Sequence, residues 1–355
     1  MRWTDIIRGT APSAGLAVAG ALVAVLLALV VEAVLILLVG KDPIEAYKFL
    51  FLGSFGSLHA ITETLTKASP LILAGLGVAF AFQCGLFNIG AEGQIYIGAL
   101  AATWVGLTFT SLPAVFLLPF VAIAAGLLGG FWGGITGFLK AKTGANEIIT
   151  TIMLNYVAIH LVSYMVDKPL RESSGFFPQT DRIAAQAYLP PLIPGTRLHA
   201  GFLAGLILVL CTYVLLYYTT VGYEVRTVGS NQRAAEFGGI SVSRSVTLAM
   251  TVSGGLAGLA GFGEVSGIHH RLLDGISPGY GFDAIAVALL GKAHPLGVIP
   301  AAIFFGALRV GGNMVQRSIG VPVAIIYSLQ GLVILFILST NYFMLQLGRL
   351  TRGRR

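Results

Sequence analysis

Four carboxylates lie in or beside strongly apolar stretches of the chain, at Glu92, Glu147, Glu264 and Asp283. An unpaired charge inside a bilayer is costly, so such acids are candidates for binding a solute or an ion. Glu92 lies in "NIGAEGQ", where we expect Asn88 to cap a helix whose first turn holds Glu92. Glu147 and Asp283 have similar N-terminal settings, and Glu264 ends an apolar run. Placement at helix ends therefore explains these acids, and contact with a solute is the alternative.

Motifs for catalysis and metal binding are absent from the sequence. It contains no G-x-x-x-x-G-K-[ST] phosphate loop, no H-E-x-x-H zinc motif and no G-x-S-x-G nucleophile elbow. Cys84 and Cys211 lie in or beside apolar runs and predict no disulfide. The acids form no series of mid-span charges, which disfavours coupling to an ion gradient. The sequence therefore predicts neither an enzyme nor a metal site, and energy for transport would come from another polypeptide.

One polar segment, "VGYEVRTVGSNQRAAEFGGISVSR" at 221–244, interrupts the apolar sequence. We expect Ser230 to cap a helix that begins at Asn231, and Gly238-Gly239 to end it in a left-handed turn. This helix would be about 10 Å long, a shape suited to transmitting a push between two spans. An ordinary structured loop is the alternative. Its expected apolar residues are Ala234, Ala235 and Phe237, and its charged residues, which would pair or face a partner, are Arg233 and Glu236.

The elements that must position these groups are membrane spans. The 355 residues are 56% hydrophobic and only 10% charged, with a net charge of +7 and a mean hydropathy of +0.85. Soluble domains carry about 25% charged residues. Apolar runs near twenty residues recur, long enough to cross a hydrocarbon core of about 30 Å. The sequence therefore predicts an all-α, polytopic membrane bundle, whose positive charge reflects inward-facing loops rather than nucleic-acid binding.

About ten transmembrane helices account for the pattern. An even number of spans places both termini on one side, and the basic C-terminal "GRLTRGRR" favours the cytoplasmic side. The expected spans are 16–39, 62–82, 89–108, 114–138, 146–165, 200–219, 244–263, 279–291, 295–313 and 321–340. Within them, glycines recur every four residues at Gly129, Gly133 and Gly137, and again at Gly254 and Gly258. This spacing predicts tight helix packing.

A weak internal repeat relates the two halves of the chain. "NIGAEGQIYIGAL" (88–100) is echoed by "GYGFDAIAVALLG" (279–291), and "GFLK" (137–140) by "GALR" (306–309). Lys140 is expected inside and Arg309 toward the outer end of its span, so the copies would be inverted. The expected organisation is one permeation domain, 1–355, with repeats at 60–166 and 244–340, an ordered Pro-rich extracytoplasmic loop at 167–199 and a cytoplasmic loop at 220–243.

Three stretches resemble a known family. "RTVGSNQRAAEFGGISVSR" resembles the coupling-helix loop of type II ABC importer permeases for sugars, branched-chain amino acids and nucleosides. "ETLTKASPLILAGLGVAFAFQCGLFNIGAEGQIYIGA" (63–99) and "GGITGFLKAKTGANEIITTIMLNYVA" (133–158) are similar to bacterial nucleoside importer permeases. The likeness extends from about Glu63 to the last span. Arg233 stands where the older EAA---G pattern has Glu, so no acidic anchor is carried over.

The resemblance implies a multi-pass protein of the bacterial inner membrane, with both termini cytoplasmic. Its partners would be a second permease subunit, a cytoplasmic ABC ATPase and an extracytoplasmic solute-binding lipoprotein. ATP and Mg²⁺ would be bound by the ATPase, and this chain would hold no cofactor. The residues expected to couple to the ATPase are Arg226, Ser230, Asn231, Arg233, Ala234, Ala235, Glu236, Phe237 and Gly238.

No family motif fixes the solute contacts. Polarity alone selects Asn88, Glu92, Gln94, Asn155 and Tyr156, because amide, carboxylate and ring groups suit a base and a ribose. The expected function is that of an alternating-access permease for nucleosides, driven by a separate ATPase. The alternatives are a permease of the same family for a simple sugar such as ribose, and an ion-coupled transporter that works alone.

Overall fold

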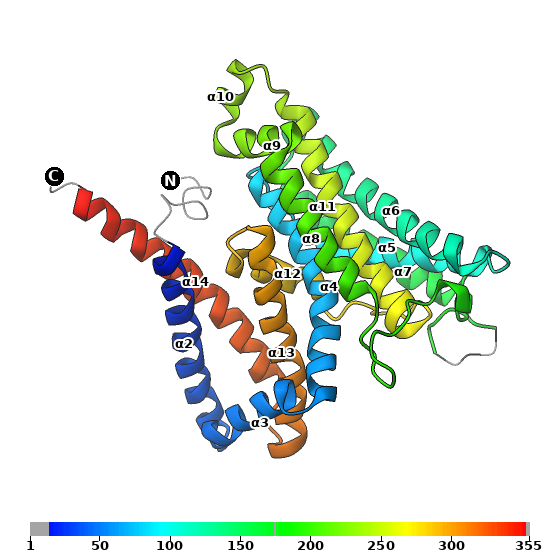
Figure 1. Ribbon diagram of the computed structural model, residues 1–355, viewed down its shortest axis with the longest axis horizontal. Coiled ribbons are helices and arrows are strands. Elements are labelled where there is room, and N and C mark those ends of the chain that lie inside the picture. Colours follow the sequence, from blue (N-terminus) through cyan, green and yellow to red (C-terminus); the bar gives the residue numbers. More distant parts are fainter. Residues whose placement is uncertain (1–13, 174, 176, 353–355) are drawn as a thin grey trace.

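The computed structural model describes residues 14–173, 175 and 177–352. Within these residues the regular elements are helices, accompanied only by isolated β-bridges, which confirms the all-α prediction. Figure 1 shows a bundle of long helices with short polar helices at one end. Two residues of the basic C-terminal stretch that orients the chain, Arg354 and Arg355, lie outside the described residues.

A helix occupies each of the ten ranges that the sequence predicts as spans. Among the described residues, six helices are long and apolar enough to cross a membrane, namely α4, α6, α7, α8, α11 and α13, or seven if the bent pair α2 and α3 is one span. The bounds are α2 (Ala14–Leu38), α4 (Leu58–Gln83), α5 (Ala91–Thr108), α6 (Ala114–Thr143), α7 (Glu147–Asp167), α8 (Gly201–Tyr218), α11 (Val242–Glu264), α12 (Tyr280–Leu290), α13 (Pro295–Ile319) and α14 (Val323–Arg352).

Helix α12 is the shortest of these ten helices. Its 11 residues are about 16 Å long, roughly half of the hydrocarbon thickness. Helix α11 is longer than its range suggests, because a π-helical turn, η2 (Val265–His269), continues it. His270 then ends this turn in the left-handed conformation, with φ of 56°.

Three short helices lie outside the predicted spans. α3 (Pro43–Phe55) bends from α2 by 117°. It begins with Asp42, whose side chain accepts a hydrogen bond from the Ile44 amide, followed by proline at the first position. α9 (Thr220–Ser230) and α10 (Gln232–Phe237) fill most of the polar segment. The segment 220–243 is therefore largely helical.

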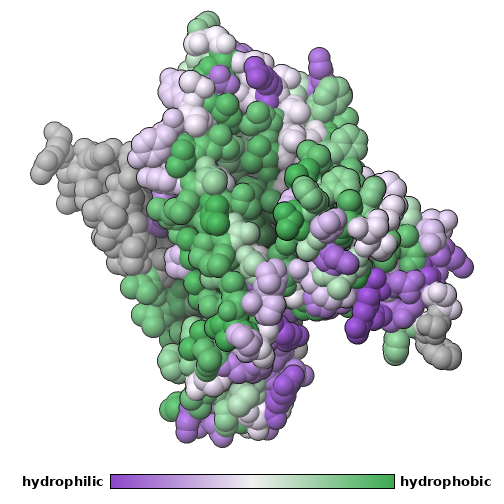
Figure 2. All heavy atoms as spheres, turned by 45° about the vertical axis from the view of Figure 1, so that its right-hand side comes forward, coloured by the Kyte–Doolittle hydropathy of each residue, from purple (hydrophilic) through white to green (hydrophobic). Residues whose placement is uncertain are grey.

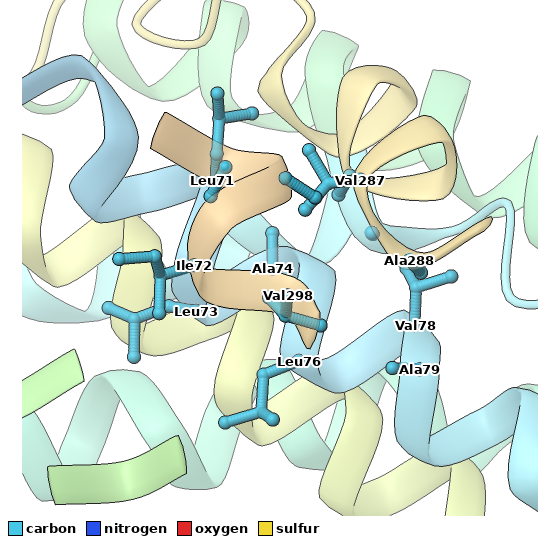
Figure 3. Close-up of a cluster of buried hydrophobic side chains, with 14 of the residues drawn as sticks. Leu71, Ile72, Leu73, Ala74, Leu76, Val78, Ala79, Val287, Ala288 and Val298 are labelled. Carbon is cyan, nitrogen blue, oxygen red and sulfur yellow. The ribbon is translucent and has the colours of Figure 1, made fainter. Parts of the chain in front are cut away.

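Helix α4 forms the centre of the bundle. It packs against α11, α13, α12, α5 and α8. Figure 3 shows its side chains Leu71, Ile72 and Ala74 clustered with Val287 of α12 and Val298 of α13, all of them buried. Because this core fills the space between three helices, α4 holds the end of α12 and the beginning of α13 in fixed positions.

The glycines of α6 and α11 form a seam between two helix backbones. A Cβ atom built on Gly129 would lie 2.6 Å from the Gly254 oxygen, and one on Gly133 would lie 2.5 Å from the Met250 oxygen. Real Cβ atoms do not approach backbone so closely, so only glycine fits here. The predicted tight packing is confirmed.

The helix pairing of the first half recurs in the second. α6 packs on α11 as α13 packs on α4, and α5 packs on α11 as α12 packs on α4. The first turns of α5 and α12 also meet, because the Gly281 amide donates a hydrogen bond to Glu92 Oε2 at 2.7 Å. Two helices that begin inside the bundle thus face one another.

The two ends of the bundle differ in character. α9 and α10 lie at one end, and α3 lies at the other (Figure 1). On the face drawn in Figure 2, hydrophobic side chains cover the middle and hydrophilic ones gather toward the ends. α2 starts, and α14 finishes, toward the end where α10 lies.

Residues 167–199 form an irregular connection with one 3₁₀ turn, η1 (Ala185–Ala187), among the described positions. This connection pairs with the stretch between η2 and α12. Thr180 N donates to Leu272 O at 3.0 Å, Ile183 N to His270 O at 3.0 Å, and Asp274 N to Pro178 O at 3.2 Å. The connection thereby supplies partners for backbone groups that no helix satisfies.

Candidate functional site

Helix α10 is a short, capped helix at one end of the bundle. Asn231 has an extended backbone and its Oδ1 accepts from Ala234 N at 3.3 Å. The prediction that Ser230 caps the helix is therefore wrong. Ser230 is the last residue of α9, and its hydroxyl donates to the Arg226 oxygen at 2.9 Å. Gly239 follows α10 with φ of +79°, which confirms the left-handed stop.

One side chain anchors α10 to the bundle while the others face outward. Ala235 is fully buried, in a cluster that includes Val225 and Val228 of α9 and Phe80 of α4. Phe237 is 94% exposed, and Ala234 is exposed as well. The three residues expected to form one apolar side therefore do not share a face: Ala235 packs against the bundle, whereas Ala234 and Phe237 are exposed. We call the exposed residues Arg233, Ala234, Glu236 and Phe237 the α10 surface.

The charged residues of α10 do not pair with each other. Among the described residues no ion pair joins Arg233 and Glu236, and both are exposed. Arg226 lies on α9 behind them, with its guanidinium 4.9 Å from the centre of the Tyr217 ring. Gly238 ends α10 by donating its amide hydrogen bond to Ala234 O at 3.1 Å. An exposed phenylalanine on the same short helix as two exposed charges is suited to a protein groove.

A second polar group lies inside the bundle and contains most of the predicted solute contacts. Asn88 Nδ2 donates to Gln94 Oε1 at 2.9 Å and to Ser253 Oγ at 2.7 Å. Asn155 Oδ1 accepts from Gly93 N at 2.8 Å, and its Nδ2 donates to Ile89 O at 2.8 Å. These amides join α5 to α7 and α11, and protein atoms take up much of their hydrogen-bonding capacity.

The remaining two predicted contacts lie apart from these amides. Glu92 is buried in the first turn of α5 and accepts from Gly281 N. Asn88 does not cap that helix as expected, because the cap position is Gly90 and Asn88 Oδ1 accepts from the Gly90 amide. Tyr156 is 58% exposed, whereas its neighbour on α7, Asn155, is 3% exposed. Tyr156 therefore lies away from the interior group.

The other acids are placed at helix ends as the sequence predicts. Glu147 lies in the first turn of α7, behind the Asn146 cap, and its Oε2 is 2.6 Å from Lys140 Nζ. Asp283 lies in the first turn of α12, and Glu264 is the last residue of α11. The helix dipole favours Glu147 and Asp283 in the first turns of α7 and α12, whereas it disfavours an acid such as Glu264 at the end of α11.

Sequence analysis missed several charged groups inside the bundle. Arg309 of α13 holds Asp283, with Nη2 2.7 Å from Oδ2, and also donates to Pro278 O at 3.0 Å. Lys67 of α4 donates to Tyr280 Oη at 3.0 Å. Basic residues within apolar runs were the available signal, but only acids were considered as candidate solute contacts within the spans. A buried acid of α2, Glu32, which accepts from Ser328 Oγ at 3.0 Å, was overlooked as well.

A further ion pair ties the connection 167–199 to α4. Arg197 Nε donates to Glu63 Oε1 at 2.9 Å, and its Nη2 donates to Oε2 at 2.5 Å. These hydrogen bonds raise the pKa of Arg197. The two residues are 134 positions apart in the chain, so no local pattern could have paired them.

Comparison with known proteins identifies the family. A model of the family described as branched-chain amino acid transport system / permease component matches residues 60–338, which is most of the chain. The chain belongs to this permease family. The permease is thus a multi-pass membrane protein and a transport component rather than an enzyme. It is a permease subunit of an ABC transporter, and such subunits work with an ATPase and a solute-binding protein.

Three relatives cover nearly the whole permease. The glucose ABC transporter permease protein TsgB13 of Haloferax volcanii is 42% identical over 95% of this chain and 90% of the relative. The guanosine ABC transporter permease protein NupP of Bacillus subtilis is 37% identical over 93% and 96%. The nucleoside ABC transporter permease protein NupB of Lactococcus lactis is 34% identical over 89% of each. No solved structure matches the permease significantly.

Proposed function

We propose that the permease is a subunit of an ATP-driven importer of nucleosides. The observation that carries the mechanism is the α10 surface, with Phe237 94% exposed on a capped helix. α11 begins at Val242, three residues after Gly239. In this proposal a partner ATPase, which binds ATP and Mg²⁺, receives α10 in a groove. Closure of the ATPase moves α10, and α11 carries that movement through the bundle to its opposite end.

The arrangement of the helices supports alternating access by two inverted repeats, 60–166 and 244–340. The recurrent pairing of α6 with α11 and of α13 with α4 is expected of such repeats. The meeting of α5 and α12 at Glu92 and Gly281 adds a contact between corresponding helix starts. Our candidates for the solute pathway are the interior residues Asn88, Glu92, Gln94 and Asn155. Tyr156 remains a candidate only for a contact outside this interior group.

The proposed coupling role of α10 also gives an orientation of the permease in the membrane. We place α10 and both termini in the cytoplasm and the connection 167–199 outside, in a bacterial inner membrane. The terminal segments α2 and α14 extend toward the end where α10 lies (Figure 1). A lipoprotein would deliver the solute to the outer end. A second permease subunit would complete the importer, and two guanosine permease proteins of Bacillus subtilis, NupP and NupQ, both match this chain.

Two relatives named for nucleosides or guanosine favour a nucleoside, and the relative named for glucose supports a simple sugar as the second candidate. Uptake of labelled nucleosides by cells that carry or lack the gene, with sugars and branched-chain amino acids as competitors, separates the two. Competition by a sugar alone would replace the nucleoside assignment. An ion-coupled transporter would move solute when purified alone into liposomes under an ion gradient, whereas this permease is expected to be inert there.

Phe237→Asp tests the α10 surface. The change places a charge where a hydrophobic anchor is expected, so the ATPase should no longer copurify and uptake should fall at least about tenfold, while the permease stays in the membrane. Phe177→Asp is the control, because Phe177 is 72% exposed on the connection at the opposite end. It should leave the ATPase bound. Normal uptake and copurification in Phe237→Asp would refute the coupling role.

A further inference from the structure

Lys67 is a cation inside the bundle that no carboxylate neutralises directly. Among the described residues no acid oxygen lies within 4 Å of its Nζ. Its one hydrogen bond goes to Tyr280 Oη at 3.0 Å, with Nζ 5.7 Å from the centre of that ring. An ammonium group has three N–H donors, so two are left for water or a solute. Intramembrane lysines of this kind normally face a hydrated path or a ligand.

The nearest acid along α4 is already occupied. Glu63 lies one turn toward the outer end, and Arg197 takes both of its carboxylate oxygens. Lys67 itself lies nine residues after the start of α4 at Leu58, about 14 Å along the helix axis. It is therefore well below the outer surface, where few other groups could satisfy its charge.

Glu264 is a buried acid with an oxygen that lacks a hydrogen-bond donor, as Lys67 lacks acceptors for two of its N–H groups. It is 1% exposed, and its Oε2 is 3.5 Å from His269 Nε2. Its Oε1 is buried and has no hydrogen-bond partner in the described part of the chain. A buried acceptor left unpaired is strongly unfavourable. Glu264 also acts electrostatically on Tyr280 and Arg197, the neighbours of Lys67 and Glu63.

The register of α4 against α11 puts these two residues at the same depth. A Cβ on Gly77 would lie 2.5 Å from Ser253 O, and Cys84 Sγ is 3.8 Å from Ser245 O. Residue numbers fall on α11 as they rise on α4, so the helices are antiparallel. Moving ten residues outward from Gly77 and Ser253 brings Lys67 level with Gly263, next to Glu264.

We propose that Lys67 and Glu264 form a solute subsite beside Tyr280, in the outer half of the bundle. The ammonium group would donate to a carbonyl or ring-nitrogen acceptor, and Glu264 Oε1 would accept from a hydroxyl or N–H group. Their charges balance, which favours an uncharged solute that offers both acceptors and donors. A nucleoside has this chemistry, so the subsite deepens the proposed function and rests on it. The subsite is distinct from the interior amides, whose partners are protein atoms.

Removing one charge at a time tests the subsite in cells that express the complete importer. Lys67→Met and Glu264→Gln should each raise the KM for labelled guanosine about tenfold or more, with Vmax changed less than threefold and the protein level unchanged. Lys48→Met and Glu45→Gln are matched controls, since both residues are exposed on α3. They should leave KM within twofold. If Lys67→Met fails to accumulate, Lys67→Gln, which keeps an N–H donor, replaces it and should show a smaller rise.

Analogues separate a solute contact from a structural role. Adenosine alters donors and acceptors of the base, and 2′-deoxyguanosine and 3′-deoxyguanosine each lack one ribose hydroxyl. The analogue that lacks the acceptor for Lys67 should have the same KM in the native importer and in Lys67→Met. An equal KM ratio for every analogue, or a fall in Vmax with KM unchanged, would overturn the subsite. If the native importer takes up only a sugar, the nucleoside assignment fails, and KM for that sugar in the same variants decides the subsite independently.

Discussion

Removal of the Arg309 side chain should destabilise the permease far more than removal of its whole ion pair. The pair is nearly buried, with the Arg309 and Asp283 side chains 9% and 18% exposed. Arg309→Met leaves the Asp283 charge without its partner, which costs about 3–5 kcal/mol. It also removes the hydrogen bond to Pro278 O, worth about 1 kcal/mol. The expected loss in free energy of unfolding is thus about 4–6 kcal/mol.

The double variant Arg309→Met with Asp283→Leu removes both charges. Apolar replacement of a buried pair is often close to neutral, so we expect the double variant within about 2 kcal/mol of the native protein. The two single changes should therefore be strongly non-additive, with an interaction energy of at least about 2 kcal/mol.

The assay is unfolding of the purified permease by a graded fraction of SDS in mixed micelles, followed by tryptophan fluorescence. The native protein, two single variants and the double variant form a complete cycle. If the effect of the double change equals the sum of the single effects within about 0.5 kcal/mol, Arg309 and Asp283 do not act as a pair and the reasoning is refuted.

Two further predictions concern the glycine seam between α6 and α11 and the buried His199. Gly129→Ala should destabilise the permease by about 1–3 kcal/mol, because the new Cβ would lie 2.6 Å from Gly254 O. Gly126→Ala, whose Cβ would have its nearest atom at 3.6 Å, should be neutral or stabilising. Equal effects of the two changes in the same SDS titration would contradict the seam. Burial lowers the pKa of His199, which Glu264 opposes only in part, so the unfolded chain takes up a proton near pH 6.5 while the folded one stays neutral. Stability should be constant above about pH 6.5 and fall below it. Thermal unfolding from pH 8 to 5 should show this slope, and His199→Gln should reduce it.

The sequence predicted the long apolar helices well because each span carries its own signal. Runs near twenty residues and glycines at every fourth position depend on no distant partner, and a helix is found in each predicted range. α3 and α9 were missed because they are short and carry polar residues. Their caps, Asp42 and Thr219, are present in the sequence, but no long apolar run follows either of them.

The interior charges were less predictable because their partners are far apart along the chain. Glu63 meets Arg197, and Lys67 meets Tyr280 at a separation of 213 residues. Only tertiary packing brings such groups together. The Ser230 cap failed for a local reason, since α9 extends through Ser230 and leaves Asn231 as the first residue with an extended backbone. Two adjacent residues with capping side chains could not be ranked without that preceding helix.

The hydrogen bonds between residues 178–183 and 270–274 have a mechanical consequence. These hydrogen bonds join the two stretches into one unit, so the stretches must move together unless the hydrogen bonds break. The unit leads directly to the first turn of α12, where Tyr280 and Asp283 lie. An antibody fragment that clamped the stretch 178–183 would therefore also immobilise the first turn of α12. In the alternating-access mechanism proposed above, it would stall the permease without touching its interior.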